Sequence, residues 1–427
     1  MEAEICQTEG KRESSYGWVV VASGLIITLI IYGIIASMAV FFKPLLQSFQ
    51  WSRGQTSLIW AANWVTFGVL SLFIGPLTDR FGARRMMLAG GCLFSLGIFF
   101  SSRATSLWHL FFFFGMLGSV GRAAVWTPLV ATVTRWFERR RGLALGLAQS
   151  YQLGTFAVVP LAAWLVTAYG WQWAFMVLGV LALVTVVPLT FFIREPRGSN
   201  ASLPQESRSA GLSRDFSLGE ALGTRAFWSL NFMVLGCCVC HSFLLLHLVN
   251  HLTDQGIAIS RAATIFGTMG AAGALGKIVN GLCADRFGAK PAIAGFLCVQ
   301  GLGLLVFVRP DQLWLIYLGA VLWGMAQGGP MTCYPMLYRE YFGERHLATV
   351  MSGLFAMVGL GMALGGLLGG ILYDATGGYQ LSFAVSLTTG LGAALIATTL
   401  QPPHSSSVGE RRGIEMNPTP GVYEAHE

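Results

Sequence analysis

Residues Gly75–Arg85, with the sequence GPLTDRFGARR, decide the fold together with a second copy at Gly281–Lys290, GLCADRFGAK. Each copy follows a long apolar run and reads Gly-x-x-x-Asp-Arg-Phe-Gly-Ala-basic. The aspartates Asp79 and Asp285 lie 206 positions apart, close to half of the 427-residue chain. A charged tight turn at the end of a membrane helix, present once in each half, indicates a duplicated membrane protein.

The composition excludes a soluble globular protein. Hydrophobic residues make up 54% of the chain and charged residues only 11%, whereas a soluble domain carries about 25% charged residues. The net charge of +7 does not indicate a nucleic-acid partner, because the basic residues lie in short loops between apolar runs. The eight cysteines show no disulfide or metal-ligand spacing, so we expect no metal site and no cofactor.

Twelve apolar runs are long enough to cross a ~30 Å hydrocarbon core as helices, which predicts an all-α polytopic membrane protein. The predicted spans are 17–42, 55–76, 86–103, 107–134, 142–168, 171–194, 225–252, 262–283, 290–308, 313–338, 347–373 and 379–400. The polar segment 195–224 is interpreted as a linker. The predicted organisation is a tail at 1–16, a six-helix half at 17–194, the linker, a six-helix half at 225–400 and a tail at 401–427.

The distribution of basic residues predicts the orientation in the membrane. With the N-terminus in the cytoplasm, 20 of the 27 Lys and Arg residues fall in inner segments. The residues in outer segments are Lys43, Arg53, Arg103, Arg261 and Arg309. This bias predicts a plasma-membrane protein with both termini and the linker in the cytoplasm.

The repeated loop resembles the loop between helices 2 and 3 of the major facilitator superfamily of transporters. That loop reads Gly-x-Leu-x-Asp-Arg-x-Gly-x-Arg-Arg, and every fixed position is present in Gly75–Arg85. The resemblance covers nearly the whole chain and implies two six-helix halves around a central substrate site. It also implies a cytoplasmic latch that holds the outward-open state, formed by Asp79, Arg80, Gly82, Arg84, Arg85, Asp285 and Arg286. The alternative is a charged turn that only sets the topology.

Two further stretches resemble the monocarboxylate transporter branch, which includes a bacterial oxalate–formate type. They are Tyr16–Val21 (YGWVVV) and Trp136–Ala148 (WFERRRGLALGLA). This resemblance implies a small organic anion as the substrate. Eukaryotic members carry a first-span lysine where this chain has Ala36, and an Asp–Arg pair where it has Gly273 and Lys277. The proton-coupling mechanism implied by the branch therefore cannot be transferred unchanged.

Lys277 and Arg122 are the cations that the sequence places inside spans. Lys277 lies eight residues before Asp285, about 12 Å along the helix, and a charge at that depth needs a partner or a cavity. Arg122 lies 13 residues before Arg135, about 20 Å along its helix. All 20 Asp and Glu residues fall in loops, tails or span ends, so we predict that the substrate anion is the counter-ion. The alternatives are a snorkelling or neutral lysine, and an arginine that gates or bonds to backbone carbonyls.

Further polar side chains inside spans are candidates for the substrate site. Trp126 lies one turn after Arg122 on the same helix face. His247 is a candidate hydrogen-bonding or proton site in the seventh span. The other candidates are Tyr32, Tyr151, Gln152, Tyr334 and Tyr338. Each of these residues is also consistent with a packing role in which its polar tip is satisfied.

These observations predict a secondary transporter, and not an enzyme, that moves small monocarboxylates such as lactate or pyruvate by alternating access. Coupling to a proton requires a titratable site, for which Lys277 and His247 are the candidates. Exchange against a counter-anion, as in the oxalate–formate type, needs no such site and stays open. A proton-coupled drug exporter is disfavoured because the sequence offers no intramembrane acid. The expected partners are the substrate anion, a proton or counter-anion, and membrane lipid; the need for an accessory membrane protein stays open.

Overall fold

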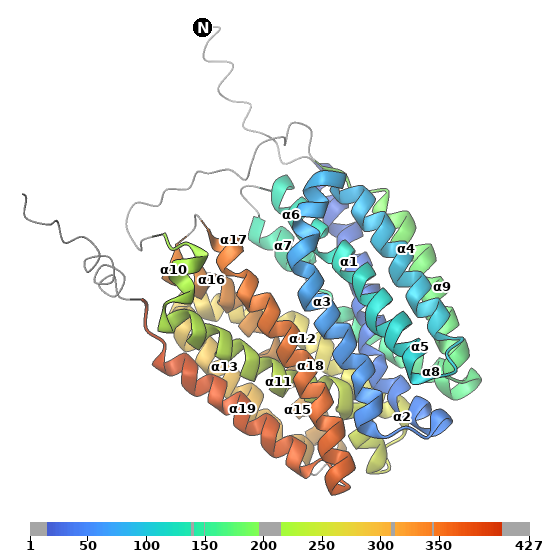
Figure 1. The fold of residues 1–427 in the computed structure, drawn as a ribbon. Coiled ribbons are helices and arrows are strands. Elements are labelled where there is room, and N and C mark those ends of the chain that lie inside the picture. The colour runs from blue at the N-terminus through green and yellow to red at the C-terminus, as the bar shows by residue number, and fades with distance from the viewer. Residues whose placement is uncertain are drawn as a thin grey trace, which may run out of the picture.

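The computed structural model describes residues 15–137, 141–148, 150–195, 215–308, 312–343 and 346–403. Within these ranges the chain is all-α (Figure 1), which confirms the predicted fold class. Most of the two predicted tails and most of the predicted linker lie outside them.

A first group of helices comes from the first six predicted spans. Its members are α1 (Ser15–Ala36), α2 (Met38–Phe49), α3 (Arg53–Phe81), α4 (Ala83–Ser101), α5 (Leu107–Leu110), the π-helical segment η2 (Phe111–Leu117), α6 (Gly118–Trp136), α7 (Arg141–Ala148), α8 (Leu153–Tyr169) and α9 (Trp171–Thr190). The short helix α10 (Leu218–Leu222) lies within the predicted linker.

A second group comes from the last six predicted spans. Its members are α11 (Arg225–Asp254), α12 (Ile259–Phe287), α13 (Ala289–Gly303), α14 (Leu305–Val308), α15 (Leu313–Gly328), α16 (Pro330–Phe342), α17 (Leu347–Val350), α18 (Ser352–Thr376) and α19 (Gln380–Thr399). Figure 1 shows this group, coloured from yellow-green to red, beside the first group, coloured from blue to green.

Eleven helical stretches among the described residues are long and apolar enough to cross a membrane. The predicted span 313–338 is not one of them, because it is divided into α15 and α16 at Gly329. Gly329 keeps a right-handed helical conformation (φ −67°, ψ −52°). Pro330 follows it and has no N–H to continue the hydrogen-bond ladder. The predicted tenth span is therefore two short helices that follow each other directly.

The repeated motif folds in the same way in both groups. Gly82 separates α3 from α4 with φ +82° and ψ 145°, and Gly288 separates α12 from α13 with φ +90° and ψ 154°. Each glycine N–H donates to the carbonyl four residues earlier, Thr78 or Ala284. Only glycine adopts such a positive φ without strain. The duplication deduced from the sequence is thus also a duplication of backbone geometry.

The two groups pack along two long interfaces, α3 against α18 and α8 against α12. Glycines allow close backbone approach at the first of these: a Cβ on Gly68 would lie 3.2 Å from the Cα of Gly359. Gly54 also packs against α18, whereas open space surrounds Gly75.

The end of the bundle that carries Gly54 and its neighbour Arg53 is hereafter the Arg53 end. The opposite end, which carries Arg84 and Glu195, is the Arg84 end.

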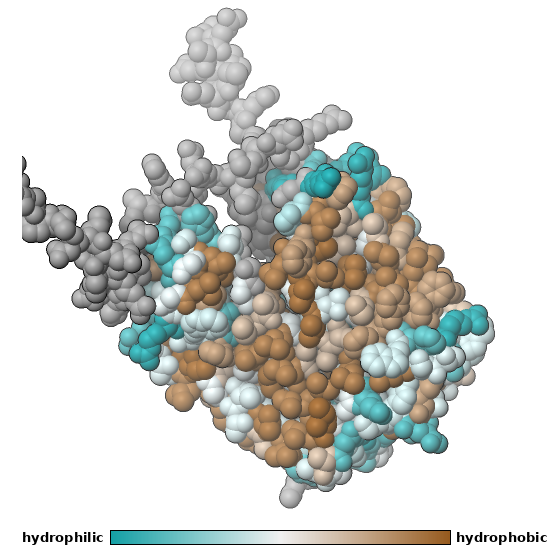
Figure 2. Space-filling view, viewed as in Figure 1, coloured by the Kyte–Doolittle hydropathy of each residue, from teal (hydrophilic) through white to brown (hydrophobic). Residues whose placement is uncertain are grey.

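Large apolar side chains cover the outside of the bundle. Phe73, Trp164, Leu282 and Leu395 each expose 57–66% of their surface, and Figure 2 shows a broad hydrophobic face with hydrophilic residues gathered towards its margins. A soluble protein rarely exposes an apolar surface of this extent to water, because its hydration is unfavourable. The chain is therefore a multi-pass membrane protein.

Glycine packing between α4 and α6 generates a stability prediction. A Cβ on Gly121 would collide with the backbone of Gly90 and Phe94, whereas one on Gly392 in α19 would meet nothing within 4 Å. We expect Gly121→Ala to destabilise the protein by about 1–3 kcal/mol through overpacking. The control Gly392→Ala should be neutral or slightly stabilising, because alanine is the better helix former. Apparent melting temperatures of the two variants in detergent test this, and equal temperatures would contradict it.

Candidate functional site

Five of the predicted site residues lie together in the structure. Tyr151 is in contact with Tyr32, Trp126 and Lys277, and Arg122 lies beside this group. The Tyr32 and Trp126 ring centroids each lie 4.6 Å from that of Tyr151. The Lys277 Nζ lies 3.9 Å from the Tyr151 ring centroid. Arg122 lies one turn before Trp126 on α6, near Tyr32 and Tyr151. These five residues, hereafter the Tyr151 cluster, come from α1, α6, the turn before α8, and α12, so both groups of helices contribute.

Arg122 is the most deeply buried cation of this cluster. Its side chain is stacked on two rings of α3, with Cζ 4.4 Å from the Trp64 ring centroid and 4.0 Å from that of Phe67. The residue exposes only 3% of its surface. Its Nε and Nη2 atoms have no hydrogen-bond partner within the described part of the chain. A buried guanidinium with two unused donors is suited to an anion that accepts parallel hydrogen bonds.

An irregular helix segment positions Arg122. The π-helical turns of η2 do not follow the regular α-helical hydrogen-bond ladder, and the Phe114 carbonyl accepts a hydrogen bond from the Asn63 Nδ2 at 3.0 Å. The Ser119 Oγ in turn donates to the Asn63 carbonyl at 2.7 Å. Because Asn63 precedes Trp64, these two bonds hold the start of α6 against the rings on which Arg122 stacks.

Gln152 occupies the space next to Gly273, the position at which eukaryotic members of the branch carry the aspartate of the Asp–Arg pair. A Cβ on Gly273 would lie 3.2 Å from the Gly324 carbonyl oxygen and 3.3 Å from the Gln152 Oε1. Gln152 is buried, and this Oε1 has no hydrogen-bond partner within the described residues. An aspartate at Gly273 would therefore have to displace the Gln152 side chain. The side chain of Gln152 lies against the same helix, α12, that carries Lys277.

Two other candidates lie deeper in the second group of helices. Tyr334 and Tyr338 are fully buried on α16. Cys238 of α11 lies in the neighbourhood of both Tyr334 and Tyr151, but no described contact joins Tyr334 to the Tyr151 cluster. Nothing in the described contacts brings Tyr338 to the cluster.

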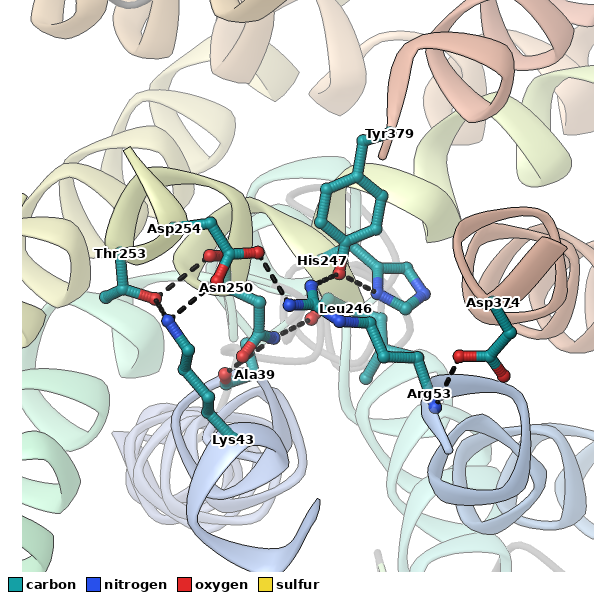
Figure 3. Close-up of polar contacts among 10 residues, drawn as sticks. All are labelled: Ala39, Lys43, Arg53, Leu246, His247, Asn250, Thr253, Asp254, Asp374 and Tyr379. Atoms are coloured by element: carbon teal, nitrogen blue, oxygen red, sulfur yellow. Dashed lines mark hydrogen bonds and ion pairs between the residues drawn. The ribbon is translucent and has the colours of Figure 1, made fainter. Parts of the chain in front are cut away.

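His247 lies apart from these residues, in a polar network at the Arg53 end (Figure 3). Arg53 of α3 donates from Nη2 to the Asp254 Oδ2 at 2.7 Å and from Nη1 to the Tyr379 hydroxyl. The Lys43 Nζ lies 2.7 Å from the Asp254 Oδ1. The His247 Nδ1 lies 3.0 Å from the Tyr379 hydroxyl. We call Lys43, Arg53, His247, Asp254, Asp374 and Tyr379 the Arg53 network.

Asp374 completes the network at the first turn of α3. Its carboxylate accepts from the backbone N–H groups of Arg53 at 2.9 Å and Gly54 at 2.7 Å. These are unpaired donors at the positive end of the helix dipole. The Arg53 Cζ also lies 3.6 Å from the Tyr373 ring centroid. Lys43 and Arg53 belong to the first group of helices and their partners to the second, so the network joins the two groups.

Sequence reasoning missed the Arg53 network apart from His247. It counted Lys43 and Arg53 only as basic residues of outer segments. The available signal is charge complementarity: Asp254 and Asp374 lie just after the seventh and eleventh predicted spans, and Arg53 lies just before the second. Trp64 and Phe67, which flank Arg122, carried no signal beyond being aromatic.

The predicted latch residues lie at the Arg84 end. The Arg84 Cζ lies 5.0 Å from the Phe191 ring centroid, and Arg85, Asp285 and Arg286 are exposed. The side chain of Asp79 lies outside the described part of the structure. The carboxylate found at the start of α4 is Glu195, which accepts from the Ala83 N–H at 2.8 Å and lies 3.8 Å from Arg135. A cavity of about 330 Å³ lies beside it, lined by residues 81–85 and 193–195.

A family model and individual relatives both match this chain over most of its length. A sequence model described as Major Facilitator Superfamily matches residues 24–273 and 242–422. Human monocarboxylate transporter 11 is 31% identical over 409 residues, which cover 89% of this chain and 82% of the human protein. Rat monocarboxylate transporter 13 is 27% identical over 406 residues, which cover 90% of this chain and 88% of the rat protein.

A solved structure shares the fold. It is that of a bacterial homologue of the human lysosomal transporter Spinster, in an inward-facing and unoccupied conformation. The TM-score is 0.72, and the match covers 92% of this chain and 100% of the other. Sequence identity is 18%, so this likeness concerns the fold alone.

The contrast between Arg122 and Arg53 generates a prediction. Arg122→Met keeps much of the side-chain volume but removes a buried charge that has two unused donors. We expect the unliganded variant to be more stable by about 1–3 kcal/mol, because an uncompensated buried charge is costly. The matched variant Arg53→Met removes the bonds to Asp254 and Tyr379, leaves Asp254 with Lys43 as its only remaining cation among the described contacts, and should lose stability. Apparent melting temperatures without substrate test both expectations, and a loss of stability in Arg122→Met would contradict the first.

Proposed function

The chain belongs to the Major Facilitator Superfamily, a family of secondary transporters and not of enzymes, and we propose that it carries small monocarboxylates such as lactate or pyruvate. The names of its relatives, monocarboxylate transporters 11 and 13, support this substrate class. The chemistry of the Tyr151 cluster supports it independently.

The observation that carries the proposal is that two cations from different groups of helices belong to one buried aromatic cluster. The Lys277 Nζ lies over the Tyr151 ring, and Arg122 lies one turn before Trp126, whose ring packs against the same tyrosine. The two unused donors of Arg122 fit a carboxylate, which a guanidinium holds through two parallel bonds. Tyr32 and Trp126 supply flat apolar surfaces for the body of a small organic acid. An anion bound here touches both groups and can couple their movement.

The moving units in this proposal are the predicted halves 17–194 and 225–400, which rock about the Tyr151 cluster. The charge bias of the loops supports the second part of the proposal, a plasma-membrane protein with its termini and linker in the cytoplasm. The Arg53 end then faces outward, and its closure by the Arg53 network corresponds to an inward-facing state. The repeated Asp-Arg loops at the Arg84 end act as the latch of the outward-facing state.

Proton coupling is our primary hypothesis for the driving force, with Lys277 as the titratable site. The alternative is exchange against a second anion, which needs no titration because a bound anion alone can permit the site to reorient. Gly273 and Ala36 stand where eukaryotic relatives of this branch carry charged residues, and this departure keeps exchange as the competing mechanism. A drug exporter is not proposed, because the two cations favour an anionic ligand.

Uptake into proteoliposomes tests substrate and coupling together. Labelled lactate, pyruvate, formate and oxalate are offered with an inward proton gradient, or with unlabelled anion trapped inside. We expect uptake of lactate or pyruvate to follow the proton gradient. Lys277→Ala should lower kcat/KM by about 10- to 100-fold, since a hydrogen bond to a charged group contributes about 1.5–3 kcal/mol.

Arg103→Ala is the control for Lys277→Ala. Arg103 is an exposed cation in the turn between α4 and α5, and its removal should leave uptake unchanged. Uptake that requires trapped anion would replace symport by exchange. Uptake that is unchanged in Lys277→Ala would overturn the site, and uptake of none of the four anions would overturn the substrate class.

A further inference from the structure

His247 is a fully buried histidine whose two ring nitrogens are both engaged, and Figure 3 shows the contact of one of them with Tyr379. The Nε2 atom lies 2.8 Å from the Gly366 carbonyl oxygen, and the Nδ1 atom lies 3.0 Å from the Tyr379 hydroxyl. A carbonyl oxygen only accepts hydrogen bonds, so Nε2 carries the proton and donates. In the neutral ring Nδ1 is then an acceptor, and it takes its hydrogen bond from the Tyr379 hydroxyl.

These bonds form a chain with a single direction that crosses between the two groups of helices. Arg53 Nη1 donates to the Tyr379 oxygen, Tyr379 donates to His247, and His247 donates to Gly366. Burial raises the pKa of Tyr379, which lies just before α19, so its hydroxyl keeps the proton that it donates. A proton added at His247 Nδ1 would face the Tyr379 O–H and break the chain.

The charges around His247 balance only when its ring is neutral. The charged and titratable groups that face it or extend its network are Lys43 of α2, Arg53 of α3, Asp374 and Tyr373 of α18, Tyr379 before α19, and His251 and Asp254 of its own helix. Two cations thus face two carboxylates. The remaining neighbours of the ring include Phe42 and Phe243, which cannot compensate a further positive charge. A proton on His247 would add an unpaired buried charge beside Arg53.

We propose that His247 is a proton-sensitive gate of the Arg53 end: the neutral ring holds this end closed, and protonation opens it. Opening separates Arg53 from Tyr379 and brings the imidazole into contact with water, where an imidazole takes up a proton near pH ~6.5. The open state therefore binds more protons than the closed state, and acid shifts the equilibrium towards it. This inference rests on the alternating access of the proposed function, but not on the identity of the substrate.

A distance measurement without substrate tests the gate. Spin labels on Gln47→Cys of α2 and Ala375→Cys of α18, both exposed positions, report the separation of the two groups at the Arg53 end. The labels are placed in a background without the native cysteines, in proteoliposomes. One proton taken up near pH ~6.5 in the open state shifts the equilibrium constant by up to about 30-fold between pH 7.5 and pH 5.0. We expect the ratio of the longer-distance to the shorter-distance population to rise by that order as the pH falls.

His247→Gln is the decisive variant, because its amide can accept from Tyr379 and donate to Gly366 but does not titrate. We expect it to stay closed at both pH values. The control His251→Gln alters the histidine one turn further along α11, whose Nε2 bonds to the Phe307 carbonyl, and it should keep the full pH response. Tyr379→Phe removes the link between His247 and Arg53 and should weaken the pH response, which gives a second test if His247→Gln does not insert.

The outcomes separate the gate from the proposed function. A pH response that is unchanged in His247→Gln or in Tyr379→Phe would overturn the role of His247. Two distances whose populations ignore pH in the unmodified protein would also overturn it, while leaving alternating access in place. A single distance under all conditions would contradict alternating access itself, and the gate with it.

Discussion

A charge buried in a membrane protein must be paired with another group or with a ligand, and this constraint distinguishes the two arginines on which the structure depends. Arg53 lies at one end of the bundle, where Asp254, Tyr379 and the Tyr373 ring engage its guanidinium. Arg122 lies deep within the first group of helices and is flanked by two aromatic rings, and two of its donors have no partner in the described chain. The satisfied arginine holds the two groups of helices together. The unsatisfied arginine supplies the reason for an anion to enter.

Both arginines extend from, or stack against, the same helix. Arg53 begins α3, and Trp64 and Phe67, on which Arg122 stacks, lie further along it. The helix of the second group that packs along α3 is α18, whose last turn provides Asp374. A movement that separates α3 from α18 at the Arg53 end would therefore carry these rings and Arg122 together, as parts of the first group, relative to Lys277 of the second group. The geometry thereby gives a direct mechanical connection between closure of one end and the shape of the Tyr151 cluster.

The sequence was sufficient for the fold class and for much of the central cluster. Long apolar runs and the turns at Gly82 and Gly288 follow from local chemistry, and inward-facing polar residues such as Tyr32, Trp126, Tyr151 and Lys277 met as a group. The break at Gly329 and the π-helical turns before Arg122 were not predictable, because a helical hydrophobic pattern continues through both. The Arg53 network was not predictable either, since Arg53 bonds to residues 201 and 326 positions away. No local periodicity records such pairings.

The most direct test of the central claim is an experimental structure determined with pyruvate bound. We expect a carboxylate within hydrogen-bonding distance of the Arg122 Nε and Nη2 atoms, with the body of the anion against the Tyr151 ring and Lys277 beside it. Pyruvate bound elsewhere, with both Arg122 donors taken by backbone carbonyls or by fixed water, would contradict the account and would make Arg122 a structural residue.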